Sequence, residues 1–215
     1  MRAANRARCG GDGLVHYPGS PQLVRAQLRA QDRLVACELH EAEHAILAAD
    51  CRADRRVAVH GRDGWEALGA LLPPREKRGL VLIDPPYEPP AVEIERVLAG
   101  LQQIRRRFPP AIVALWYPIK DRTTNRRFLR RVGALELGEV LLAELCVWPD
   151  DTAVRLNGSG MLVINPPWQF DQMLAVELEW LWRKLGHDAL GRHDLGLLAQ
   201  YLNTSQSPQQ GTPFR

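Results

Sequence analysis

The residues best suited to chemistry follow a short apolar run: Asp84-Pro85-Pro86-Tyr87. The run itself, residues 79–83, has four apolar residues after its glycine, two of them β-branched, which predicts a strand buried on both faces within a parallel sheet. Two consecutive prolines have no backbone N–H to donate, so the strand must end at Asp84. Ligands of open α/β sheets bind at the carboxyl ends of the strands, where these groups are therefore expected.

This set of groups fits an exocyclic amine on a nucleobase. Such an amine has two N–H donors and a lone pair delocalised into the ring, so an enzyme must accept both hydrogens and hold the base flat. Asp84 and the carbonyl of Pro85 are the predicted acceptors, and Tyr87 is predicted to stack on a base that has left its helix. The alternative is that the four residues form only a rigid turn.

Composition indicates an ordinary soluble globular protein with one core, since the 215 residues are 46% apolar and 25% charged. The net charge of +3 and the pI of about 8.8 permit a polyanionic partner without requiring one. The four cysteines form no Cys-x-x-Cys pair, so neither a zinc knot nor a disulfide framework is indicated. The scattered cysteines fit a protein of the reducing cytoplasm, and we expect no metal. No apolar run approaches the roughly 20 residues that cross a membrane.

Strands and helices are expected to alternate, which predicts an α/β fold with a doubly wound parallel sheet. The expected helices are residues 20–29, 41–49, one that includes Trp65 and Leu68, 92–107, 121–131 and 169–185; the expected strands are residues 34–37, 57–59, 79–83, 111–117, 141–148 and 160–164. Ser20 is expected to cap the first helix. The last two strands follow one another like a hairpin, which is typical of the class I S-adenosylmethionine-dependent methyltransferase (Rossmann-like) sheet, and we expect the final one to be an antiparallel edge strand.

Six motifs in order resemble one family. They are Tyr17-Pro18-Gly19-Ser20-Pro21, Glu38-Leu39-His40, Asp63-Gly64, Leu82-Ile83-Asp84-Pro85-Pro86-Tyr87-Glu88, Ala114-Leu115-Trp116-Tyr117-Pro118, and Gly160-Met161 with Ile164-Asn165-Pro166-Pro167-Trp168. Over residues 14 to 185 the chain resembles the bacterial 23S ribosomal RNA adenine-N(6) methyltransferase family called RlmJ. Each motif is common, but the series is specific.

The resemblance implies that Asp84 is the catalytic proton acceptor and also contacts the methyl donor, S-adenosylmethionine. It implies that Ser20, Glu38, Asp63 and Gly64 are further donor contacts. A carboxylate such as Glu38 at a strand end can accept both ribose hydroxyls, and Asp63 can accept from the adenine amino group of the donor. The alternatives are a helix cap for Ser20, an acidic residue ahead of a helix for Glu38, and a plain turn for Asp63-Gly64.

The family's members begin with a segment that has no counterpart here and that includes the first strand and a glycine loop for the donor. Gly10-Gly11-Asp12-Gly13 is no replacement, because only polar residues precede it. We therefore expect a methyltransferase domain over residues 14–186 that lacks a strand between residues 34–37 and 79–83. Residues 1–13 and 187–215 are expected to be disordered.

Two other motifs are set aside. Asn165-Pro166-Pro167-Trp168 also fits an amine-methylating pattern, but it follows an antiparallel strand and should lie at the rim opposite the donor. His40-Glu41-Ala42-Glu43-His44 matches the zinc-protease pattern, but His40 is expected at a strand exit, so the two rings should not converge.

The expected activity is methylation of the 6-amino group of an adenine in protein-free 23S rRNA by a monomer. Two clusters of basic side chains could contact phosphates or form merely solvated helix faces: Lys120, Arg122, Arg126, Arg127, Arg130 and Arg131, and Arg105 to Arg107. A DNA adenine methyltransferase is an alternative, although no separate target-recognition domain is visible. The other alternative is a catalytically inactive remnant that binds RNA.

Overall fold

The computed structural model describes residues 17–148, 156–185 and 197–201. The chain divides into two compact units, Met1–Ala70 and Leu71–Arg215. Strands and helices alternate as the sequence predicted, in an α/β fold whose larger sheet is mixed.

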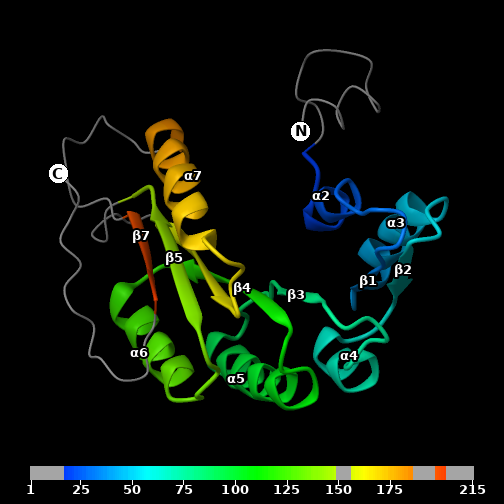
Figure 1. Ribbon diagram of the computed structural model, residues 1–215, viewed down its shortest axis with the longest axis horizontal. Coiled ribbons are helices and arrows are strands. Elements are labelled where there is room, and N and C mark those ends of the chain that lie inside the picture. The colour runs from blue at the N-terminus through cyan, green and yellow to red at the C-terminus, as the bar shows by residue number, and fades with distance from the viewer. Residues whose placement is uncertain (1–16, 149–155, 186–196, 202–215) are drawn as a thin grey trace. The chain divides into compact units, whose positions relative to one another are not determined.

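The first unit contains two parallel strands, β1 (Leu34–Cys37) and β2 (Val57–His60), with Leu34 opposite Val57 and Cys37 opposite His60. Its helices are α2 (Ser20–Arg25), α3 (Glu41–Cys51) and α4 (Gly64–Leu71), whose last residue falls in the second unit. Parallel strands need a crossover, which α3 provides (Figure 1). The carboxyl ends of β1 and β2 therefore lie at the same edge.

Helix α2 differs from its prediction at both ends. Gly19, with extended backbone, is the N-cap residue and Ser20 is the first helical residue, so Ser20 is not the cap. The helix ends at Arg25 rather than near residue 29, because later backbone groups are bound by side chains. Arg56 donates to the Leu28 carbonyl at 2.5 Å, and Asp32 accepts from the Arg29 amide at 2.9 Å.

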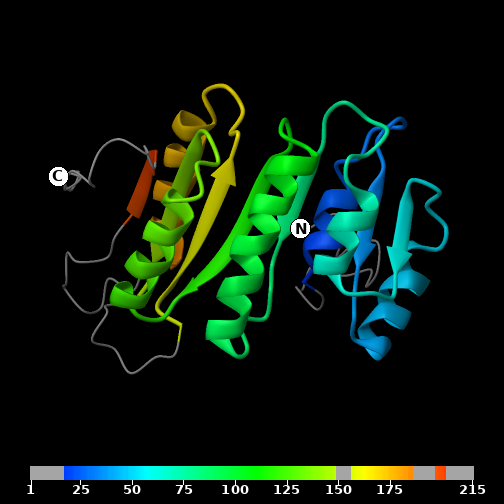
Figure 2. The ribbon, with the colours of Figure 1, turned by 90° about the horizontal axis from the view of Figure 1, so that it is seen from below.

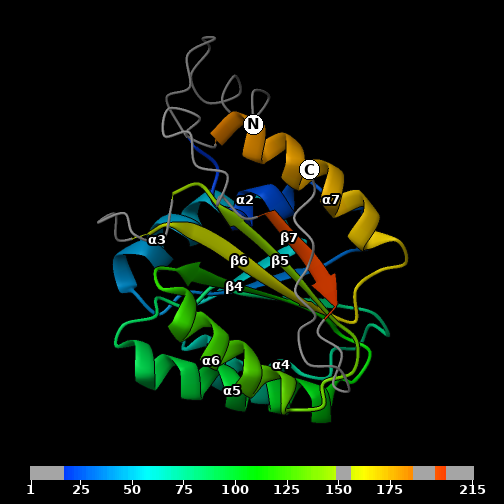
Figure 3. The same cartoon turned by 90° about the vertical axis from the view of Figure 1, so that its left-hand side faces the viewer.

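The second unit is built on a five-stranded sheet of order β3-β4-β6-β5-β7. The strands are β3 (Leu80–Ile83), β4 (Ile112–Ile119), β5 (Val140–Cys146), β6 (Gly158–Ile164) and β7 (Leu197–Tyr201). Helices α5 (Pro90–Arg107) and α6 (Arg122–Gly133) lie side by side on one face, and α7 (Phe170–Leu185) lies on the other (Figures 2 and 3). Among the described helices, none is both long and apolar enough to span a bilayer.

Two expectations about the far side of this sheet were wrong. The strand that contains Gly160–Ile164 is antiparallel, as predicted, but it is inserted between β4 and β5 rather than placed at the edge. The edge is formed by β7, which pairs antiparallel with β5 and lies in the region 187–215 that was expected to be disordered.

Strand β4 also continues through Pro118, where the sequence predicted its end. The Trp116 carbonyl accepts a hydrogen bond from the Tyr87 hydroxyl, so it faces away from β6. The nitrogen of Pro118, two residues later, faces the same way. The pairing of β3 with β4 ends at Ile83 and Leu115, so no described strand lies beside Pro118 on this side. The missing N–H of Pro118 therefore breaks no strand pairing.

Strand β3 is an edge strand of the described sheet, whereas its sequence predicted burial on both faces. Leu80 is 58% exposed and Leu82 is 41% exposed, although Ile83 is buried. In the first unit, Val35 on β1 is likewise 44% exposed. Among the described strands, β1 pairs only with β2 and β3 only with β4, so each has one unpaired edge.

Tyr117 links three strands of the second unit. Its ring lies over Gly160 of β6, its hydroxyl donates to Glu144 Oε1 of β5 at 2.6 Å, and it meets Phe128 of α6 edge to face at 5.6 Å. Burial, and then the neighbouring Glu144 carboxylate, raise the pKa of Tyr117 well above its ordinary value. The hydroxyl therefore stays protonated and remains a donor.

Gly160→Ala is expected to lower the free energy of unfolding by about 1–3 kcal/mol, because the new Cβ would overlap the Tyr117 ring. Chemical denaturation of the full chain, followed through a signal of the second unit, measures this loss. Gly133→Ala is the matched control, since a Cβ there meets nothing within 4 Å. Equal stability of the two variants would contradict the packing of Tyr117.

Candidate active site

Asp84 stands directly after β3, at the carboxyl end of the strand. Its side chain is exposed and makes no hydrogen bond or ion pair with the residues that the structure describes. Partial desolvation raises its pKa above the ordinary 3.8. The carboxylate therefore has no partner within the described part of the chain and is a stronger base than an ordinary aspartate.

The chain beyond Asp84 runs beside the part of β4 that extends past the end of β3. Four residues, Trp116–Ile119, form this extension, because Ile83 pairs with Leu115 and β4 ends at Ile119. The Tyr87 hydroxyl donates to the Trp116 carbonyl at 2.9 Å, and the two rings meet edge to face at 6.1 Å. These contacts hold the Asp-Pro-Pro-Tyr segment against β4.

The structure places Tyr87 differently from its predicted role. Tyr87 is only 5% exposed, so its ring presents no open face on which a base could stack. Its backbone is in the left-handed region (φ 54°), which is unfavourable for an aromatic residue. Burial, with smaller effects from Asp84 and Glu93, raises the pKa of the Tyr87 hydroxyl, which remains a donor. Tyr87 therefore anchors the segment in this conformation.

Two neighbours of Tyr87 were not among the predicted site residues. Trp116 lies one residue beyond the end of the β3–β4 pairing, and Glu93 is 3% exposed in the first turn of α5. Glu93 precedes Val97 and Leu101 at four-residue spacing, so the buried row of the helix could have revealed it. No sequence signal indicated that Trp116 faces Tyr87, because this depends on where β3 ends.

Three of the predicted donor contacts meet at one edge of the first unit. Glu38 and Asp63 follow the adjacent strands β1 and β2, the Glu38 amide donates to the His60 carbonyl at 3.0 Å, and Gly64 approaches Cys37. Glu38 Oε1 accepts from the His40 amide at 2.8 Å, and Asp63 Oδ1 accepts from the Trp65 amide at 2.7 Å. Both carboxylates thus also support helix starts. Ser20 is exposed at the start of α2.

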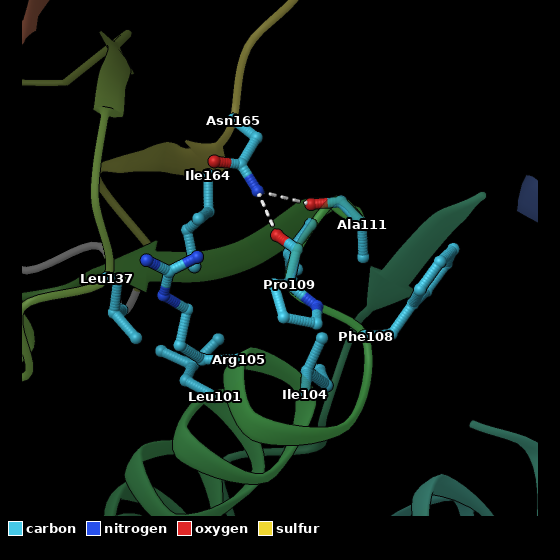
Figure 4. A pocket seen from close by; sticks show the side chains of 10 residues that line it. Leu101, Ile104, Arg105, Phe108, Pro109, Ala111, Leu137, Ile164 and Asn165 are labelled. Atoms are coloured by element: carbon cyan, nitrogen blue, oxygen red, sulfur yellow. Dashed lines mark hydrogen bonds between the residues drawn. The ribbon is translucent and has the colours of Figure 1, made fainter. Parts of the chain in front are cut away.

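Asn165 has a structural role at the opposite rim, as the sequence predicted for its location. Ile164 pairs with Val113 near the start of β4, and Asn165 Nδ2 donates to the carbonyls of Pro109 (2.9 Å) and Ala111 (2.8 Å) (Figure 4). Arg105 and Leu137 line the same cavity, which has a volume of only about 10 Å³. The Asn165 amide is consequently committed to backbone groups.

The two histidines of the zinc-protease pattern lie in different settings. His40 is the N-cap residue of α3, with extended backbone, and His44 is a turn further on, close to Gly61. Within residues 17–148, 156–185 and 197–201, no three His, Cys, Asp or Glu side chains are grouped so that they could hold a metal ion.

Comparison with known proteins identifies the family of the chain. Residues 3–196 match the family model RsmJ, described as "Ribosomal RNA large subunit methyltransferase D, RlmJ". The chain belongs to this family. The resemblance stated from the six motifs is thereby confirmed.

Two proteins called "Ribosomal RNA large subunit methyltransferase J" are similar to the chain. The Escherichia coli protein is 41% identical over 172 residues, and the Haemophilus influenzae protein is 36% identical over 191 residues. These matches cover 80% and 89% of this chain, and 61% and 68% of the relatives. The chain thus spans a little under two thirds of the length of the E. coli relative.

A crystal structure of a Legionella pneumophila protein has a similar fold. It matches with a TM-score of 0.77 and 30% sequence identity, over 93% of this chain and 70% of the other. The α/β assignment is therefore supported by an experimental structure as well as by the strand order.

The raised pKa of Asp84 predicts a specific pH dependence of stability. Above pH 3.8 and up to the raised pKa, the folded state binds more protons than the unfolded state, so the free energy of unfolding falls as pH rises. Asp84→Asn should remove this decline, as measured by denaturation from acidic to neutral pH.

Asp32→Asn is the control for the opposite sign. Hydrogen bonds from Arg29 lower the pKa of Asp32 to about 2, so its contribution is present at neutral pH and is lost as pH falls. If Asp84→Asn and Asp32→Asn change the pH profile in the same direction, the assigned environment of Asp84 is wrong.

Proposed function

We propose that the chain transfers a methyl group from S-adenosylmethionine to the 6-amino group of an adenine in protein-free 23S rRNA. The observation that carries this proposal is the Asp84 carboxylate of an Asp-Pro-Pro-Tyr segment, which has no partner among the described residues and lies at the end of a strand in a chain of the RlmJ family. The relatives named as ribosomal RNA large subunit methyltransferases support an rRNA substrate.

In the proposed mechanism, Asp84 and the Pro85 carbonyl accept the two hydrogens of the target amine. Accepting both hydrogens fixes the amine in orientation and increases the electron density on its nitrogen. The nitrogen gains the methyl group and loses one proton, for which Asp84 is the acceptor. Its raised pKa favours this role, because a more basic carboxylate takes the proton more readily.

Tyr87 remains the proposed stacking partner of the target base. Its hydroxyl bond to Trp116 and its burial mean that stacking requires the ring to leave this contact. The left-handed backbone of Tyr87 supports such a change, because strained residues are held only by their surroundings. Tyr87 would then exchange an anchoring role for a role in binding the base.

Ser20, Glu38, Asp63 and Gly64 are the proposed donor-binding residues. Carboxylates at the carboxyl ends of adjacent parallel strands suit ribose hydroxyls and an adenine amino group, so the chemistry of this edge fits S-adenosylmethionine. When bound, the donor supplies an electrophilic methyl group on a sulfonium. Glu38 holds its carboxylate in place through the His40 amide, which leaves less rotamer freedom to lose on binding.

Asp84→Ala should abolish methylation of protein-free 23S rRNA, since the amine loses its charged acceptor, while RNA affinity stays within about twofold. Transfer of a radiolabelled methyl group and a filter-binding assay measure the two effects. Glu139→Ala, which removes an exposed carboxylate from the same unit, is the control. Normal turnover by Asp84→Ala would place catalysis elsewhere.

Glu38→Gln should weaken S-adenosylmethionine binding about 10-fold or more, because a hydrogen bond to a charged acceptor contributes roughly 1.5–3 kcal/mol. Titration calorimetry measures this binding without any methyl transfer. The matched control is Glu41→Gln, in the first turn of α3. An equal loss in both variants would exclude a specific contact from Glu38.

A second candidate is an RNA-binding protein without methyl transfer. Among the described strands, β1 and β3 each have an unpaired edge in their own sheets, which favours it, because side chains on an edge strand are positioned less firmly than those on a strand paired on both sides. Calorimetry distinguishes the two candidates: micromolar donor binding supports the enzyme, and RNA binding without donor binding supports the second candidate.

A further inference from the structure

Helix α6 carries five arginines and no acidic residue between Arg122 and Gly133. Arg126 and Arg130 are exposed and four residues apart, so like charges are neighbours about 6 Å apart along the helix axis. A helix face that meets only water usually mixes the two signs of charge. The unmixed charge of α6 is unfavourable unless an anion lies against it.

Pairing within the protein leaves part of this charge uncompensated. Arg131 forms a two-pronged bond with Glu95 of α5, at 2.6 and 2.8 Å. Asp121, the N-cap residue, accepts from the amides of Thr123 and Thr124, and its pKa is lowered first by a hydrogen bond from the Thr124 side chain, then by these amide bonds and by Arg127. Among the described residues, no carboxylate pairs with Arg126 or Arg130.

The position of α6 connects this charge with the candidate active site. The helix begins directly after β4, whose last four residues extend about 13 Å beyond the end of β3 at which Asp84 lies. From there α6 runs along the face of the sheet that α5 also covers (Figure 3). A polymer bound along α6 therefore reaches the rim of the sheet that carries Asp84.

We propose that Arg126 and Arg130, with Lys120 nearer the rim, bind phosphate groups of RNA independently of its sequence. Guanidinium groups match phosphate in a planar, two-pronged geometry, and a row of them suits a polyanion better than a single acidic side chain. This inference rests on the proposed function for the choice of RNA. Beyond the proposed function, it assigns the surface that binds the phosphate backbone of the substrate.

The test compares two variants that lose equal charge. Arg126→Gln/Arg130→Gln should weaken binding of a protein-free 23S rRNA fragment about 10-fold and reduce the slope of log affinity against log salt by about two. Arg105→Gln/Arg106→Gln, at the end of α5 near the opposite rim, should change both quantities little. Thermal unfolding of each variant verifies that it is folded.

Arg126→Lys/Arg130→Lys should retain most of the affinity, because the charge is kept. Equal weakening by the α6 and α5 variants would mean that only net charge matters, and would overturn the proposal. Unchanged affinity in Arg126→Gln/Arg130→Gln would also overturn it, as would competition by polyglutamate at the same charge concentration as RNA.

The outcome is separable from that of the proposed function. RNA binding that depends on α6, in a chain that transfers no methyl group, would support the surface and refute the enzyme. Methyl transfer with full RNA affinity in Arg126→Gln/Arg130→Gln would support the enzyme and refute the surface.

Discussion

The pairing of a short strand with a long one determines the candidate active site. Because β3 ends opposite Leu115 and β4 continues for four more residues, the backbone of Trp116 has no partner on that side among the described strands. Instead, the Tyr87 hydroxyl donates a hydrogen bond to the Trp116 carbonyl. A single hydrogen bond to a carbonyl thus replaces the strand pairing and fixes the path of the chain after Asp84.

The two prolines after Asp84 determine where β3 ends. Pro85 and Pro86 cannot extend the β3–β4 ladder, so the strand stops where the carboxylate begins. Asp84 is left exposed and has no hydrogen-bond partner among the residues that the structure describes, whereas Glu38 and Asp63 each accept a backbone N–H. This difference in hydrogen bonding distinguishes Asp84, the proposed proton acceptor, from Glu38 and Asp63, the proposed donor contacts.

The sequence predicted the elements of the fold well, because their signals are local. Apolar runs identified β1 to β6, helical spacing identified α5 and α7, and the antiparallel direction of β6 placed Asn165 at the rim away from Asp84. The errors arose where distant residues decide the outcome. Arg56 ends α2 early, the end of β3 permits Pro118 inside β4, and β7 is stabilised by pairing with β5. The burial of Tyr87 likewise depends on Trp116, 29 residues away.

The exposed side of β3 has a consequence for the protein in solution. Leu80 and Leu82 lie on a strand whose outward N–H and C=O groups have no partner among the described strands. Such an edge is a template for any extended segment that meets it, including the same strand of another molecule. Self-association through sheet extension should therefore increase with concentration, and it would leave the pairing of β4 with β6 intact.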